Sequence, residues 1–106
     1  VVISASPLPI VRAAAPLAGI AEHAAIEVRI QAGRFTREVL EPIPYAEGKV
    51  AAATLFGPLI VACGDSLPGD LPLLSAARVA AVVAPSTCSP LSLEANRRGW
   101  PILSQN

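Results

Sequence analysis

Four polar side chains in this sequence have the types and positions needed to hold a phosphate group and a divalent metal ion. Ser4 ends the apolar run that opens the chain, and Lys49 lies at the expected start of a helix. Asp65 and Asp70 belong to the turn-forming segment GDSLPGD, which follows a second apolar run. A hydroxyl and a lysine can bind phosphoryl oxygens, and carboxylate oxygens are the ligands that Mg²⁺ prefers. The residues therefore predict a phosphate and magnesium site.

The elements around these residues are expected to alternate between strands and helices. Apolar runs predict strands at residues 1–4, 59–63, 79–84 and 100–103, and helical spacing or helix-start residues predict helices at residues 7–19, 48–55, 70–77 and 91–98. From Ala25 apolar and polar residues alternate, which predicts one strand, a turn at the letters AGR, and a second strand over Phe35 to Leu40. Such a chain forms a parallel sheet with an added hairpin, and its ligands bind at the carboxyl ends of the strands.

Composition excludes several other classes of protein. Of 106 residues, 53% are apolar and 15% are charged, and the net charge is zero, so neither a disordered chain nor a basic nucleic-acid-binding surface is expected. The charge-free stretch at residues 50–64 is shorter than the roughly 20 residues of a membrane span and contains Pro58. Since no secretory signal is visible, we expect a cytoplasmic protein without membrane or nucleic-acid partners.

Each candidate residue also has a simpler interpretation. Asp70 could serve only as a helix N-cap, and Ser4 could only satisfy N–H groups of its loop, as could Ser6. His23, the single histidine, is expected in a loop at the opposite strand end, where a structural role is favoured over acid–base chemistry. Cys63 is expected to be a buried, inert thiol, although one disulfide with the other cysteine stays open.

Three segments, in order, resemble the motifs of a known family. VVISASP, EGK and GDSLPGD resemble the second, third and fourth motifs of the haloacid-dehalogenase-like (HAD) phosphohydrolases in order and approximate spacing. ISASP, AVVAPS and RRGWPIL look most like the branch that contains phosphoserine phosphatase. The resemblance covers almost the whole chain and implies a Rossmann-like, three-layer α/β core with strand order 3-2-1-4-5. It also implies a Mg²⁺-dependent phosphatase that acts on a small phosphorylated metabolite through a phosphoaspartyl intermediate.

The resemblance also implies a role for each residue. Ser4 would donate its hydroxyl to the phosphoryl group, helped by the backbone N–H of Ala5, and Lys49 would bridge the phosphate and the nucleophile. Asp65 would ligate Mg²⁺. Asp70 would support the metal directly, or through water and the lysine.

The family's first motif, DxDx followed by Thr or Val, is absent from the sequence. That motif supplies the nucleophilic aspartate and the general acid, so the chain alone is not expected to turn over substrate. The sequence contains no Met and begins within an apolar run, and we expect residues 1–106 to be one partial domain, the C-terminal part of the core. An upstream segment would complete the sheet between the strand ending at Ser4 and the strand ending at Cys63. The alternatives are a non-catalytic binding or assembly module with the same fold, or a phosphotransferase.

Overall fold

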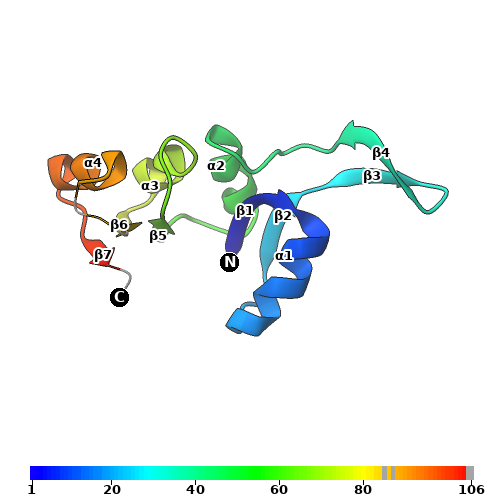
Figure 1. Ribbon diagram of the computed structural model, residues 1–106, viewed down its shortest axis with the longest axis horizontal. Helices are drawn as coiled ribbons and strands as arrows, with labels where there is room; N and C mark the ends of the chain where they lie inside the picture. The colour runs from blue at the N-terminus through cyan, green and yellow to red at the C-terminus, as the bar shows by residue number, and fades with distance from the viewer. Residues whose placement is uncertain (85, 87, 105–106) are drawn as a thin grey trace. The chain divides into compact units, whose positions relative to one another are not determined.

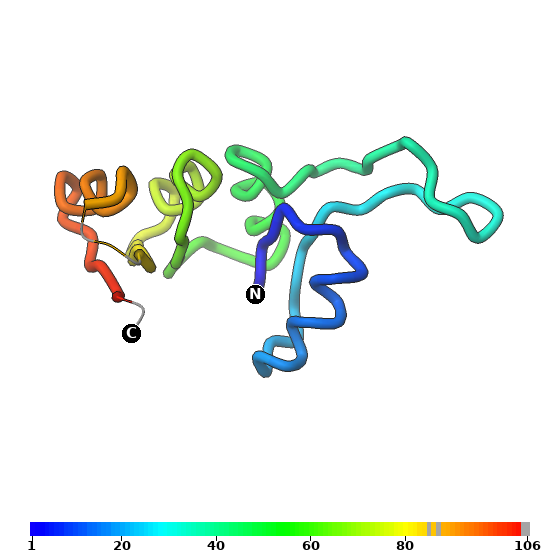
Figure 2. Tube along the Cα trace, viewed as in Figure 1, coloured from blue at the N-terminus to red at the C-terminus, as the bar shows by residue number. Residues whose placement is uncertain are grey.

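The computed structural model describes residues 1–84, 86 and 88–104 of the chain. Contacts divide the chain into two compact units, Val1–Gly57 and Pro58–Asn106. Figures 1 and 2 show the course of the chain through each unit. We describe each unit by itself.

The first unit contains a two-stranded parallel sheet. Strand β1 (Val2–Pro7) pairs with β2 (His23–Ile26), and helix α1 (Leu8–Ala14) and the 3₁₀ helix η1 (Ala15–Ala18) connect them. Pro16 lies in the first turn of η1, and Gly19 ends that helix in the left-handed conformation with φ +71°. The expected helix is therefore confirmed, with its last turn tightened where the proline removes an N–H donor.

An antiparallel hairpin follows, as the alternating sequence predicts. Strands β3 (Val28–Gln31) and β4 (Arg34–Val39) meet at a turn in which Ala32 and Gly33 have φ values of +50° and +73°. The prediction of one continuous first strand is wrong, because the chain leaves β2 at Ile26 and enters β3 at Val28. Alternation with a period of two shows which side chains share a face of a strand, but it does not show which strand is the partner. The alternating pattern therefore continues across the point where the chain passes from the parallel sheet to the hairpin.

Helix α2 (Glu47–Thr54) completes the first unit and packs against β1. Its second residue, Gly48, lies directly against the backbone of the preceding loop. A Cβ atom at Gly48 would come within 1.7 Å of the carbonyl oxygen of Ile43. Only glycine therefore allows the chain to enter the helix at this point and place Lys49 in its first turn.

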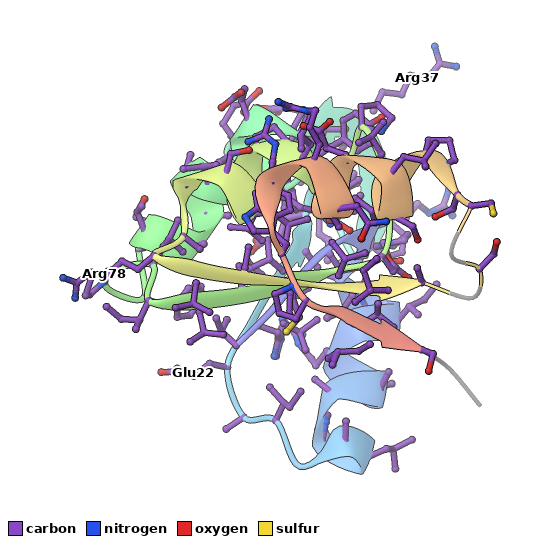
Figure 3. The ribbon with its side chains drawn as sticks, turned by 90° about the vertical axis from the view of Figure 1, so that its left-hand side faces the viewer. Glu22, Arg37 and Arg78 are labelled. Carbon is purple, nitrogen blue, oxygen red and sulfur yellow. The ribbon has the colours of Figure 1, made fainter. Side chains whose placement is uncertain are left out.

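The second unit is a three-stranded parallel sheet with two helices. Its elements are β5 (Val61–Gly64), α3 (Leu71–Ala76), β6 (Val79–Ala84), α4 (Pro90–Arg98) and β7 (Ile102–Ser104), with strand order β5-β6-β7. Figure 3 shows α4 over one face of this sheet. The core between helices and sheet includes Leu74, Val82 and Ala95, all fully buried.

The opposite face of this sheet carries exposed apolar side chains. Val61 and Val79 lie opposite each other in the register and are 63% and 54% exposed, and Leu103 is 51% exposed. Cys63 is a free, exposed thiol, so the prediction of a buried thiol is wrong. The residues of this strand are apolar on both faces, which is why the sequence predicted burial. The helices of this unit contact β5 and β6 from one side, where Ala62 is buried. Cys63 is the next residue along the strand, so its side chain lies on the other face.

The expected α/β class is confirmed in its coarse form: small parallel sheets with helical connections, and an antiparallel hairpin. Among the described residues, β1 and β5 are each an edge strand of their own sheet. Among the helices of the described residues, none has the length and apolar character needed to cross a membrane.

Candidate phosphate and magnesium site

The loop that joins β5 to α3 is organised by the carboxylate of Asp70. Asp70 is only 4% exposed, and its Oδ2 accepts hydrogen bonds from the backbone N–H of Asp65 at 3.0 Å and of Ser66 at 3.0 Å. The hydroxyl of Ser66 donates to the same oxygen at 3.1 Å. Although Asp70 occupies the N-cap position of α3, its side chain makes no capping hydrogen bond there. The interpretation as a simple N-cap is therefore wrong, because the carboxylate turns back onto the loop.

Gly64 makes this arrangement sterically feasible. A Cβ atom at position 64 would lie 2.7 Å from the Cβ of Asp70 and 3.0 Å from its Oδ2. The glycine is thus needed for the close approach of the Asp70 side chain. The Gly–Asp–Ser order in the sequence is the local signal for this loop, but only the fold shows which atom its N–H groups meet.

Asp65 is the exposed carboxylate of the loop. It follows directly after the carboxyl end of β5, and its backbone is held by Asp70 while its side chain is exposed. Mg²⁺ is commonly bound by one or two protein carboxylates, with water and phosphate oxygens as the other ligands. Asp65 fits the role of such a ligand. Oδ2 of Asp70 already accepts three hydrogen bonds, so this oxygen positions the loop.

Within the described residues, no group of three or more His, Cys, Asp or Glu side chains is arranged to hold a metal ion. The two carboxylates of the loop are the predicted metal residues, and they have unlike surroundings: Asp65 is exposed and Asp70 is buried. The two carboxylates therefore differ in burial and in hydrogen bonding, a difference that their spacing in the sequence does not show.

Ser4 lies where the pairing of β1 with β2 becomes irregular. Regular register ends at Ile3 and resumes at Pro7, so residues 4–6 form a bulged stretch of the strand. The strand continues to Pro7 and does not end at Ser4 as expected, since the backbone stays extended through the bulge. The Oγ of Ser4 accepts a hydrogen bond from the backbone N–H of Ser6 at 3.1 Å. A hydroxyl that accepts a hydrogen bond keeps its own proton to donate, so this bond is compatible with phosphate binding.

Lys49 and Ala5 complete the predicted phosphate residues. Lys49 is half-buried in the first turn of α2, and its backbone N–H donates to the carbonyl of Ala46 at 3.0 Å. Helix α2 packs against β1, the strand that carries Ser4 and the exposed Ala5. These residues belong to the first unit, and the aspartates belong to the second.

Comparison with known proteins identifies a shared fold. No protein-family model matches the sequence, and no curated protein matches it. The chain is similar to a crystal structure of a protein of unknown function from Bordetella pertussis Tohama I, with a TM-score of 0.82 and 23% sequence identity. The match covers 95% of this chain and 48% of the other, so the chain spans about half the length of that protein. This likeness shows an α/β fold, which in the Bordetella protein is part of a longer chain.

Proposed function

We propose that this chain is the C-terminal part of a Mg²⁺-dependent phosphomonoesterase with a HAD-like, three-layer core. The observation that carries the proposal is the Gly64–Asp70 loop. It presents the exposed carboxylate of Asp65 just beyond the carboxyl end of a parallel strand and is held in shape by the buried carboxylate of Asp70. In parallel α/β sheets this end of the strands is where ligands bind.

In this proposal, different residues of the chain bind the phosphate and the metal ion. The hydroxyl of Ser4 and the backbone N–H of Ala5 donate to phosphoryl oxygens, and the ammonium group of Lys49 balances negative charge between phosphate and nucleophile. Asp65 ligates Mg²⁺, and Asp70 keeps the Asp65 backbone in place. When bound, Mg²⁺ supplies neutralisation of charge on the phosphoryl group.

The nucleophile belongs to an upstream segment in this proposal. The bond from phosphorus to the leaving alcohol oxygen breaks as a bond to an aspartate oxygen forms, and the alcohol takes up a proton from the general acid. Water then attacks phosphorus and gives a proton to the general acid residue, which lost its own in the first step, and the bond from phosphorus to the aspartate oxygen breaks to release inorganic phosphate and the free carboxylate. The same segment adds a further strand. The unpaired edges of β1 and β5 among the described residues support this part of the proposal, because proteins usually pair or cover an exposed strand edge.

The test is turnover of p-nitrophenyl phosphate by the protein that carries this sequence together with its upstream segment. We expect Mg²⁺-dependent release of free phosphate. Asp65→Asn should lower the rate at least about 100-fold, because metal stabilisation of a phosphoryl group is worth several kcal/mol. Glu22→Gln is the matched control, since it removes an exposed carboxylate outside the loop (Figure 3), and it should leave the rate unchanged.

Metal binding is measured separately from turnover. Mn²⁺, used as a paramagnetic substitute for Mg²⁺, should broaden the NMR amide signals of residues 65 and 66 in the same longer protein, and Asp65→Asn should abolish that broadening. Full activity in Asp65→Asn would overturn the magnesium assignment. Absence of turnover in the longer protein would favour a binding module, and transfer to an acceptor without release of phosphate would favour a phosphotransferase. Either result rejects the phosphatase proposal.

A further inference from the structure

An apolar hollow lies within the first unit, between the start of α1 and the hairpin. Its volume is about 520 Å³, and it is lined by residues 7–10, 12, 26–28, 30 and 35. Ile30 and Phe35 are partners in the register of β3 and β4 and are 61% and 67% exposed, and Ile10 of α1 is 60% exposed. Small-molecule sites commonly have volumes of about 300–1,000 Å³ and mostly apolar walls. Large apolar side chains that stay exposed around one hollow indicate that the hollow has an occupant.

The hollow begins at the end of the strand that carries the predicted phosphate residues. Pro7 ends β1 and pairs with Ile26, the last residue of β2, so both lie at the carboxyl end of this parallel pair. Ser4 and Ala5 precede Pro7 on the same strand by three and two residues. At about 3.3 Å per residue, they lie at most about 10 Å from the start of the hollow. A phosphate group held by Ser4 and Ala5 therefore has this hollow within reach of its ester group.

The lining favours an uncharged hydrocarbon group. Arg12 and Glu27 are the charged residues of the lining and have opposite signs, and the rest of the lining is aliphatic, aromatic or proline. Hydrocarbon gains free energy when it leaves water for such a surface. A charged or strongly polar group would lose its hydration there without an equivalent set of hydrogen bonds.

We infer that this hollow holds the leaving group of the substrate, and that the substrate is a phosphate monoester of an apolar alcohol. The inference rests on the proposed phosphatase reaction and adds its substrate class. The hydrocarbon chain of the ester packs against Ile10, Ile30 and Phe35 while the phosphate is bound by Ser4 and Ala5. Because the three apolar side chains contact only the part that leaves as the alcohol, they determine which ester is chosen.

The test is a series of ethyl, butyl, hexyl and octyl phosphate, hydrolysed by the longer protein with Mg²⁺ and followed as release of free phosphate. Octyl phosphate is used below the concentration at which it forms micelles. We expect kcat/KM to rise about two- to fourfold for each added methylene group, because full burial of one methylene corresponds to about fourfold and part of the chain stays in contact with water.

Matched variants assign the effect to this hollow. Ile30→Thr and Phe35→Thr should each reduce the rise per methylene group, and the strands should persist because both side chains are exposed and threonine suits a strand. Leu17→Thr is the control, since Leu17 is 90% exposed and lies outside the lining. In all three variants kcat/KM for ethyl phosphate should stay unchanged, which a general loss of structure would not allow.

The outcomes separate this inference from the phosphatase proposal. Equal kcat/KM for all four esters would overturn the inference alone and leave the upstream segment as the occupant of the hollow. A rise with chain length that persists in both Ile30→Thr and Phe35→Thr would also overturn it, because the alkyl chain would then bind elsewhere. No turnover of these esters or of p-nitrophenyl phosphate would reject the phosphatase proposal and the inference with it.

Discussion

Replacing Gly64 by alanine tests whether the Asp70 loop is held as tightly as the structure indicates. Gly64 does not have a positive φ, and at such positions a change from glycine to alanine usually raises the free energy of unfolding by about 0.4–1 kcal/mol. Here the added Cβ would lie 2.7 Å from the Cβ of Asp70, well inside van der Waals contact. The structure therefore predicts a change of the opposite sign.

The magnitude follows from the contacts that must move. Overpacking in a closely packed site costs about 1–3 kcal/mol. If Asp70 moves away, its bonds to the N–H groups of Asp65 and Ser66 also weaken, and hydrogen bonds to charged groups are worth about 1.5–3 kcal/mol each. After subtraction of the usual gain from alanine, we expect Gly64→Ala to lower the free energy of unfolding by about 2–4 kcal/mol.

The assay is urea unfolding followed by the fluorescence of Trp100, the single tryptophan, which belongs to the same unit as the loop. Asp70→Gly in the Gly64→Ala background removes every Asp70 atom that the new Cβ would meet. The alanine substitution should therefore cost much less when it is made in the Asp70→Gly protein. A neutral or stabilising Gly64→Ala, or an equal cost in both backgrounds, would refute the close-approach argument.

Two further predictions concern other parts of the chain. Gly48→Ala should disrupt the start of α2 more severely than Gly64→Ala disrupts the Asp70 loop, because the Cβ at position 48 would lie 1.7 Å from a backbone oxygen. Amide hydrogen exchange should show a loss of protection in residues 47–54. Unchanged protection would contradict this prediction. Glu94 accepts hydrogen bonds from Arg97 and Arg98, which lower its pKa from 4.5 to about 2. Since the folded pKa lies below the unfolded one, this carboxylate stabilises the fold above pH 4.5 and loses that effect as the pH falls toward 2. Urea titrations should show wild type and Glu94→Gln converging over this range, and a constant difference would show that the ion pairs do not contribute.

Local chemistry along the chain was sufficient to predict many of the elements. Gly19 and Gly99 end helices in the left-handed conformation, as glycine readily does. The apolar run of β6 and the hairpin around Ala32 and Gly33 were predicted because their signals are contained within a few neighbouring residues. The candidate residues Ser4, Lys49, Asp65 and Asp70 were chosen on the same basis, from residue type and position at strand ends or helix starts.

The sequence by itself therefore determined where helices stop, where the hairpin turns and which residues carry suitable chemistry. Only the tertiary structure decided that the alternating segment divides at Glu27, that Cys63 is exposed, and that Asp70 turns back to bind the N–H groups of Asp65 and Ser66. The physical reason is that strand partners, burial and close approaches depend on atoms brought together by folding. The side chain of Asp70 would be equally suited to capping the helix. Because Gly64 has no side chain, there is room for the Asp70 carboxylate to turn back onto the loop.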